Sequence, residues 1–330
     1  MKLTIRRKGH NYELNFIQLN QWVGHNMSLK NYMVASLVKH FSGAKYMEYE
    51  SDMIENVRID SEVLGRKYFN VIYIKDRETI LSYLKMGKLS LLKDYVSNLV
   101  KNAVNKEYIE RLDGALTILY QEINNSLHNT GINIEIGYEA SLLDNLYTGP
   151  ELEIDGYQLE ESSNYRLLCE LLTIVEQLQK ANNTKTLIIL ENIDHLVERD
   201  EYKGLCQRIE ILTQKSDTWT ILTSSIDGFL CIDASTLEGV SVVNENIYSM
   251  PGFEEIKEFV QQNYPIEKRF TDQEIEALVE VSASKIGEQY IEDLRGHIVA
   301  RLINKSEVFQ NSCKPLSMPE MTFLSGQNML

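Results

Sequence analysis

The sequence is poor in residues that cross-link or break a chain, and it lacks any long apolar run. Its 330 residues include 4 cysteines and 5 prolines. The cysteines are widely separated and form no C-x-x-C pair, so neither a disulfide framework nor a zinc site is predicted. The 6 histidines form no H-E-x-x-H pattern, and no G-x-S-x-G motif marks a hydrolase nucleophile. No apolar stretch approaches the ~20 residues that span a bilayer, and none follows the basic start to complete a signal peptide. We therefore expect a cytoplasmic protein without a membrane partner.

Acidic residues are in excess, but the charge is unevenly distributed. The net charge is −15, which alone argues against a nucleic-acid partner. Residues 1–106 nevertheless contain 17 Lys and Arg against 10 Asp and Glu, a net charge of +7, whereas the remainder carries −22. A basic N-terminal third on an acidic chain is the asymmetry that marks an anion-binding face.

Hydrophobic residues, counted with Ala, Tyr and Cys, make up 43% of the chain, which suffices for a packed core. Alternating apolar residues near the start of the chain predict short strands. Apolar residues at helical spacing then predict a helix over residues 27–41, capped by Asn26 or Ser28. Continuous apolar runs at residues 68–74, 186–194 and 218–227 predict buried strands of a parallel sheet covered by helices on both faces.

Between these strands the apolar residues recur at a helical period. Residues 76–127 predict a long helical arm with a break near residues 102–106, and residues 165–180 predict another helix. The dipeptide Asp155-Gly156, between alternating apolar residues, predicts the turn of a β-hairpin.

The C-terminal part begins after Pro251-Gly252. Thr271 and Glu274 form a capping-box pattern that predicts a helix start, and a further amphipathic helix is predicted beyond it. The last fifteen or so residues, with Pro315 and Pro319 nearby, are predicted to form a loose tail.

The fold class that these elements predict is α/β, with a mostly parallel sheet. Residues 1–90 and 182–250 are expected to form a discontinuous α/β head domain. Residues 91–181 are expected to form an inserted helical leg, and residues 251–330 a small C-terminal helical extension with a loose tail.

The stretch GHNMSLKN, residues 24–31, has the length and the lysine of a nucleotide-binding P-loop, G-x-x-x-x-G-K-[ST]. Gly24 and Lys30 fall in register with that pattern. Leu29 replaces the second glycine and would obstruct close approach of the backbone to phosphate. Asn31 replaces the Ser or Thr whose hydroxyl binds magnesium. We interpret the stretch as a degenerate nucleotide loop.

The apolar strand before residue 191 tests this interpretation independently. In P-loop NTPases the corresponding strand ends in Asp, which in the hydrolysing members is usually followed by Glu. Here it ends in Glu191-Asn192, so the metal-side carboxylate is longer and the candidate general base is missing. ATP hydrolysis is therefore not expected, and the chain is predicted not to be an enzyme.

A group of basic residues surrounds the start of the helical arm and is the candidate DNA-binding set. It comprises Lys75, Arg77, Lys85, Lys88, Lys93, Lys101 and Lys106. No aromatic cluster accompanies these residues, so contacts to phosphate are expected rather than contacts to base edges. The alternative is an ordinary solvated helix face.

The stretch ELEIDGYQLEES, residues 151–162, resembles a calcium loop in part. Glu151, Glu153, Asp155 and Gly156 occupy the first, third, fifth and sixth positions, but Ser162 stands where a bidentate Glu is needed. The hairpin interpretation is favoured, and no metal ligands are assigned.

The stretch FIQLNQWVGHNMSLKNYMVASLVKHFSGAKY resembles the N-terminal segment of the CRISPR-associated adaptation protein of type II-A systems, in its longer subfamily. NNTKTLIILENIDHLVERDEYKGLCQRIEIL and TWTILTSS fit the same family in the same order. The similarity covers about residues 1–250, with a C-terminal extension that the longer members share.

This resemblance implies a P-loop ATPase-like (RecA/ABC-like) head without hydrolytic activity, a helical leg, and four subunits that close a ring. It also implies that ends of double-stranded DNA thread through the ring, whose lysines contact the DNA backbone, during acquisition of new spacers with the CRISPR integrase complex and effector nuclease. An acidic exterior and a basic lumen would explain the net charge. Shorter members hold calcium with acidic residues, so the resemblance implies calcium as a possible cofactor, with residues 133–139 and 151–155 as candidate segments.

Two other functions stay open. One is an active P-loop or AAA+-type ATPase, in which Arg295 would act as a lid-domain arginine. The other is a scaffold that binds only protein partners through its acidic surface.

Overall fold

The computed structural model describes residues 1–101, 103–130, 151–181, 184–226, 228–286 and 317–324. Contacts between residues group the chain into two units. We call Met1–Tyr68 with Ile221–Leu330 the terminal unit and Phe69–Thr220 the central unit, and each is described by itself. The head, leg and extension predicted from the sequence are a different division, which stays a prediction.

A six-stranded sheet has the strand order β11-β10-β3-β9-β8-β5. Its strands are β3 (Leu19–Val23), β5 (Asn70–Ile74), β8 (Thr186–Leu190), β9 (Thr218–Thr223), β10 (Val240–Val243) and β11 (Ile247–Ser249). Within the terminal unit β3 pairs parallel with β10, and β11 pairs antiparallel with β10. Within the central unit β5 and β8 pair in parallel. The predicted α/β class with a mostly parallel sheet is confirmed.

The terminal unit also contains a small antiparallel sheet of order β2-β1-β4, made of β1 (Lys2–Arg7), β2 (His10–Asn15) and β4 (Val57–Ile59). One face of this sheet is apolar because Leu3, Ile5 and Leu14 are buried there. Helix α1 (Met27–Phe41) follows β3, and Asn26 caps it by accepting a hydrogen bond from the Leu29 N–H. Asn26 is thus the cap, and not Ser28.

In the C-terminal part of the terminal unit, the described helices are α8 (Phe253–Asn263), α9 (Asp272–Ser282) and α11 (Met318–Leu324). Helices α8 and α9 pack side chains of their own against buried residues of β3 and β10 in one apolar cluster. The predicted capping box of Thr271 and Glu274 begins α9. The prediction of a loose tail is wrong for residues 318–324, where Glu320 accepts a hydrogen bond from the Tyr264 hydroxyl at 2.5 Å.

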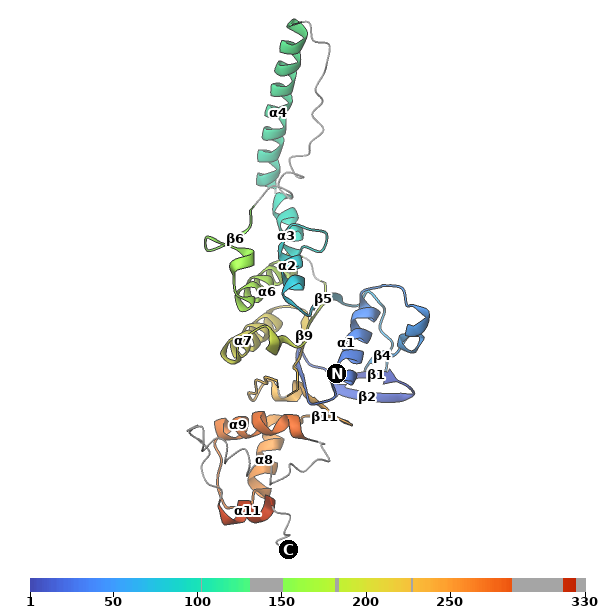
Figure 1. Cartoon of the computed structure of the whole chain (residues 1–330), viewed down its shortest axis with the longest axis vertical. Helices are drawn as coiled ribbons and strands as arrows, with labels where there is room; N and C mark the ends of the chain where they lie inside the picture. The colour runs from blue at the N-terminus through green and yellow to red at the C-terminus, as the bar shows by residue number, and fades with distance from the viewer. Residues whose placement is uncertain (102, 131–150, 182–183, 227, 287–316, 325–330) are drawn as a thin grey trace, which may run out of the picture. The chain divides into compact units, whose positions relative to one another are not determined.

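The central unit contains α2 (Arg77–Leu84), α3 (Leu91–Val100), α4 (Ala103–Asn129), α6 (Asn164–Ala181) and α7 (Arg199–Lys215). Helix α6 packs against α2, α3 and α7, and α4 continues the direction of α3 (Figure 1). The hairpin of β6 (Glu153–Ile154) and β7 (Tyr157–Gln158) turns at Asp155-Gly156, both of which have positive φ. The predicted hairpin and the predicted break between α3 and α4 are confirmed.

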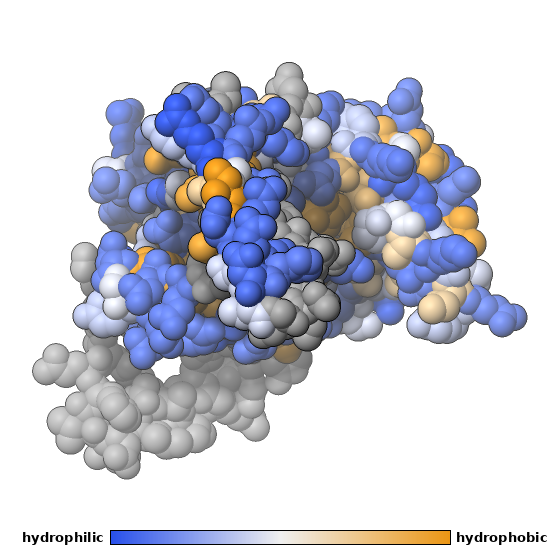
Figure 2. Space-filling view, turned by 90° about the horizontal axis from the view of Figure 1, so that it is seen from above, coloured by the Kyte–Doolittle hydropathy of each residue, from blue (hydrophilic) through white to orange (hydrophobic). Residues whose placement is uncertain are grey.

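Short 3₁₀ turns complete the described structure. They are η1 (Glu48–Met53), η2 (Leu159–Glu161), η3 (Ile193–His195), η4 (Leu237–Gly239) and η5 (Ala283–Lys285). Among the described residues, no helix combines the length and the apolar character needed to cross a bilayer. The face seen in Figure 2 is mostly hydrophilic, and its apolar side chains form small separate groups.

Candidate functional site

The loop at residues 24–31 leads from β3 into α1 and packs closely against the end of β10. Gly24 has a φ of +100°, a conformation that side chains rarely adopt. A Cβ at this position would lie 2.6 Å from the Val243 carbonyl oxygen and 2.7 Å from Asn244 Oδ1. The glycine is therefore required by contacts within the protein, without any need for a bound phosphate.

The backbone N–H groups that would bind a phosphate in a working P-loop have internal acceptors here. The His25 N–H donates to Asn244 Oδ1 at 2.7 Å. The Asn26 N–H donates to the Val243 carbonyl at 3.0 Å. The Leu29 N–H donates to Asn26 Oδ1 at 3.0 Å, as at an ordinary helix N-cap. The anion-binding end of α1 is thus filled by oxygens of the protein itself.

Asn244 also ties this loop to the C-terminal part of the terminal unit. Its Nδ2 donates to the Ser284 carbonyl at 3.1 Å and to the Ile286 carbonyl at 2.7 Å. Sequence reasoning missed Asn244, because a single asparagine so far from the loop forms no motif with it. The signal that could have found it is the apolar run of residues 240–243, which ends there.

Lys30, the lysine of the P-loop pattern, is 1% exposed. Its Nζ donates to the Gly24 carbonyl at 2.7 Å and to the Ser224 carbonyl at 2.5 Å. Leu29 is a buried residue of α1, and Asn31 is exposed. We predicted that Leu29 obstructs the approach of phosphate to the loop backbone. In the structure, Val243 and Asn244 accept the hydrogen bonds of the loop N–H groups.

The second part of the predicted nucleotide site lies in the central unit, directly after β8. The Tyr73 hydroxyl donates a hydrogen bond to Glu191 Oε2. Burial, and then this bond to a carboxylate, raise the pKa of Tyr73. Asn192 has a left-handed φ of +51° and begins the turn η3. Glu191 is therefore held by a tyrosine of the neighbouring strand β5.

Arg77, at the start of α2, is fixed by hydrogen bonds within the central unit. Its guanidinium donates to Asn164 Oδ1 at 2.5 Å, to the Glu160 carbonyl at 2.7 Å and to the Ser162 carbonyl at 2.9 Å. These bonds join α2 to the segment before α6. In this conformation Arg77 positions elements of the protein, and its donors face inward.

The predicted lysines lie around α2, α3 and the start of α4, and their surroundings differ. Lys85 pairs with Glu160 at 2.7 Å, Lys106 pairs with Glu110 at 3.6 Å, and Lys93 is half-buried. Lys75, Lys88 and Lys101 are exposed and form no ion pair with the residues that the structure describes. The structure therefore leaves three of the seven predicted cations available to an external anion.

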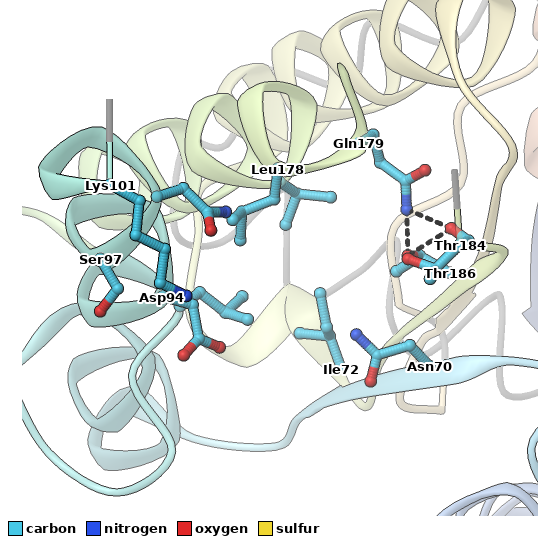
Figure 3. A pocket seen from close by; sticks show the side chains of 12 residues that line it. Asn70, Ile72, Asp94, Ser97, Lys101, Leu178, Gln179, Thr184 and Thr186 are labelled. Carbon is cyan, nitrogen blue, oxygen red and sulfur yellow. Dashed lines mark hydrogen bonds between the residues drawn. The ribbon is translucent and has the colours of Figure 1, made fainter. Parts of the chain in front are cut away.

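Lys101 also lines a cavity of about 290 Å³ in the central unit. Figure 3 shows its side chain at the C-cap of α3, with Gln179 of α6 and Thr186 of β8 on other walls. Gln179 Nε2 donates to the Thr184 carbonyl at 2.7 Å and also contacts the Thr186 hydroxyl. Gln179, Thr184 and Thr186 are thus hydrogen-bonded to one another at this wall of the cavity.

A calcium site finds no geometric support in the part of the chain that the structure describes. No group of three or more His, Cys, Asp or Glu side chains comes close enough there to hold a metal ion. Asp155, from the candidate segment 151–155, forms an ion pair with Arg166. The other candidate segment, residues 133–139, and Arg295 lie outside the described residues.

Comparison with known proteins shows the family to which this chain belongs. No curated protein matches the sequence. A solved structure, the crystal structure of Stu0660 of Streptococcus thermophilus, is similar with a TM-score of 0.75 over 99% of each chain, at 22% identity, and shares the fold. The family described as CRISPR-associated protein Csn2, subfamily St, matches residues 7–300. The chain therefore belongs to the Csn2 family of CRISPR-associated proteins, in its St subfamily.

Proposed function

We propose that this protein binds the ends of double-stranded DNA without sequence preference and without catalysing a reaction. Membership of the Csn2 family implies a role in CRISPR spacer acquisition. The proposed activity supplies that role with a protein that holds DNA while other components cut and join it. The assembly we propose is a ring of four subunits with lysines facing the DNA, acting beside the CRISPR integrase complex and the effector nuclease.

The state of the phosphate loop supports the absence of nucleotide chemistry. Oxygens of Val243 and Asn244 accept hydrogen bonds from the backbone N–H groups that a nucleotide phosphate would need. Lys30 is buried and donates to two backbone carbonyls. A nucleotide would have to displace all of these bonds before it could bind. This filled loop is the observation that favours a binding protein over an ATPase.

The exposed lysines of the central unit support a contact to DNA phosphates. Lys75, Lys88 and Lys101 carry charges that the described residues do not neutralise by ion pairing. Contact of such charges with DNA phosphates is favourable because it releases the counterions condensed on DNA. Lys85, Lys93 and Lys106 belong to the same proposed surface. Arg77 supports it indirectly, because its hydrogen bonds hold α2 in place.

The test is a charge reversal of Lys75, Lys88 and Lys101 to Glu, measured by binding to a linear duplex over a range of salt concentrations. We expect the affinity to fall at least tenfold, and the slope of log K against log salt to become shallower by roughly three, because three phosphate contacts are lost. A matched control reverses Lys180, Arg199 and Lys215, which are exposed cations of α6 and α7.

The control variant carries the same net charge as the test variant, so it separates a local contact from a general loss of attraction. Equal losses in the two variants would contradict the proposed surface. Unchanged binding by the test variant would contradict it as well. Turnover of magnesium-ATP by the unsubstituted protein would contradict the proposed absence of catalysis.

A further inference from the structure

The small sheet of the terminal unit has two chemically different faces. Along β1, Leu3 and Ile5 are buried while Lys2 and Arg6 are exposed, because successive side chains of a strand point to opposite faces. Strand β4 repeats this pattern, with Val57 and Ile59 buried on either side of the exposed Arg58. We call the surface formed by Lys2, Thr4, Arg6, Asn11, Glu13 and Arg58 the outer face of the small sheet.

Three cations are grouped on or beside this outer face. Arg58 pairs in register with Thr4, so it is a diagonal neighbour of Arg6, at about 7–8 Å between Cα atoms. Lys8 follows in the turn between β1 and β2, where Lys8 and Gly9 have positive φ. Arg6, Lys8 and Arg58 are exposed and form no ion pair with the described residues. Within the part of the chain that the structure describes, no direct contact with an acidic group compensates their charges.

Arg7 shows what a structural arginine looks like in the same strand. Its guanidinium donates to Ser28 Oγ at 3.1 Å and lies 4.8 Å from the centroid of the Tyr32 ring. These contacts join β1 to α1 on the opposite face of the sheet. Arg6 and Arg58 have no comparable side-chain partner among the described residues, so the fold does not explain why they are arginines.

Two acidic groups near this face lie at the end of β1 where Lys2 stands. Glu13 pairs with the Lys2 ammonium at 3.7 Å, and Asp60 Oδ1 accepts the Lys2 N–H at 2.7 Å. These two carboxylates are therefore satisfied locally by Lys2. The opposite end carries Arg6 and Lys8, and the exposed Glu55 lies one residue before Asn56, whose carbonyl accepts the Arg6 N–H at 2.9 Å. Cations therefore outnumber carboxylates at that end.

The chemistry of the outer face restricts what it can bind. None of the six side chains that define the outer face is apolar or aromatic. The face therefore offers neither an aromatic platform for unpaired bases nor an apolar anchor for a membrane. Arginines beside Thr4 and Asn11, which donate hydrogen bonds, are the groups that proteins use for backbone phosphates of a duplex.

We infer that the outer face of the small sheet is a second contact surface for duplex DNA, on which Arg6, Lys8 and Arg58 bind backbone phosphates. The inference rests on the proposed function, because it takes duplex DNA as the partner. It adds a surface in the terminal unit to the lysines of the central unit. An open sheet face contacts the side of a duplex, so this contact requires no DNA end.

The test replaces Arg6 and Arg58 by Glu in the full chain and measures binding to a linear duplex as a function of salt. We expect the affinity to fall at least fivefold and the slope of log K against log salt to become shallower by roughly two. The matched control replaces Lys45 and Lys67, two other exposed cations of the terminal unit, by Glu. Arg6→Gln with Arg58→Gln, which keeps hydrogen-bonding side chains, should give an intermediate loss. Thermal unfolding of each variant verifies that the sheet is folded.

Each outcome has a definite meaning. A loss in the Arg6 and Arg58 variant with unchanged binding by the control supports the inference. Equal binding by these two variants overturns the inference alone, as long as the unsubstituted protein binds duplex. No binding by the unsubstituted protein overturns the proposed function and this inference with it. Binding of the same proteins to vesicles of anionic lipid is the second measurement. A loss of vesicle binding in the Arg6 and Arg58 variant, with its duplex binding unchanged, would assign the face to a membrane and overturn the inference.

Discussion

At the scale of single residues, Asn244 closes the phosphate loop and joins it to the C-terminal helices. Replacement by Ala removes the acceptor of the His25 N–H and the donor to the Ser284 and Ile286 carbonyls. Because buried groups are left unsatisfied, we expect the free energy of unfolding to fall by roughly 2–4 kcal/mol. Urea unfolding followed by circular dichroism measures this change.

The control for that change is Asn246→Ala. Asn246 lies in the same turn, but its side chain is exposed. Its replacement should alter the free energy of unfolding by no more than about 0.5 kcal/mol. Similar losses for the two variants would mean that the turn, and not the Asn244 amide, determines the stability of this region.

Residue identities in the loop were predictable only where they form a pattern. Gly24 and Lys30 stand out because the P-loop spacing is fixed, and Asn26 was one of two predicted caps. The partners of these residues, Asn244 and Ser224, lie some two hundred positions later in the sequence. A sequence motif records which side chains are present, whereas the acceptor of each N–H depends on how distant strands are paired.

At the scale of elements, the start of α2 makes a pH-dependent prediction. Asp76 caps this helix, and the Thr79 hydroxyl and N–H donate to its carboxylate, which lowers the pKa of Asp76. A lowered pKa means that the cap stabilises the folded state above the ordinary carboxyl pKa, and that this contribution is lost as pH falls. We expect Asp76→Ala to cost about 1 kcal/mol at neutral pH and progressively less below about pH 4. Urea unfolding from pH 7 to pH 3 measures the difference.

Asp76→Asn is the matched variant, because an amide oxygen still accepts the Thr79 N–H but does not titrate. At pH 7, Asp76→Asn should therefore lose less stability than Asp76→Ala loses. A gap between the unsubstituted protein and Asp76→Ala that stays constant down to pH 3 would show that the carboxylate charge contributes nothing to the cap.

Most elements of the central unit were predictable from spacing, and one break was not. The hairpin at Asp155-Gly156 and the strands β5 and β8 were expected from local patterns. The arm was predicted as one helix before residue 102, but α2 ends at Leu84 and α3 begins at Leu91. Ser90 caps α3 by accepting the Lys93 N–H at 2.9 Å. Gly87 and Ser90 were the available signals, and the apolar period that continues through both helices concealed them.

At the scale of the whole molecule, the α/β class followed from apolar strands separated by helices, but the division into units did not. The terminal unit combines residues from both ends of the chain, and the central unit lies between them in sequence. Helical periodicity separates elements by type, whereas compact units depend on which elements pack together. β9 illustrates the difference, because the boundary at Thr220 falls inside this single strand.

The charge of the whole chain predicts opposite effects of salt on assembly and on DNA binding. Each subunit carries a net charge of −15, so salt screens the repulsion between subunits. Salt also removes the advantage of counterion release, so it weakens DNA binding. Native mass measured without DNA should therefore stay near four times 38.1 kDa, about 152 kDa, as salt is raised. The mass increment from a short linear duplex should disappear over the same range.

The topology of the DNA supplies the control for this measurement. If DNA threads through a ring, a covalently closed circle offers no end and should bind more weakly than a linear fragment of the same sequence and length. Contacts by the outer face of the small sheet need no end, so any binding of the circle that survives should be lost on changing Arg6 and Arg58 to Glu. A mass of one subunit at every salt concentration, or equal affinity for circles and linear fragments, would contradict a ring that encloses DNA ends.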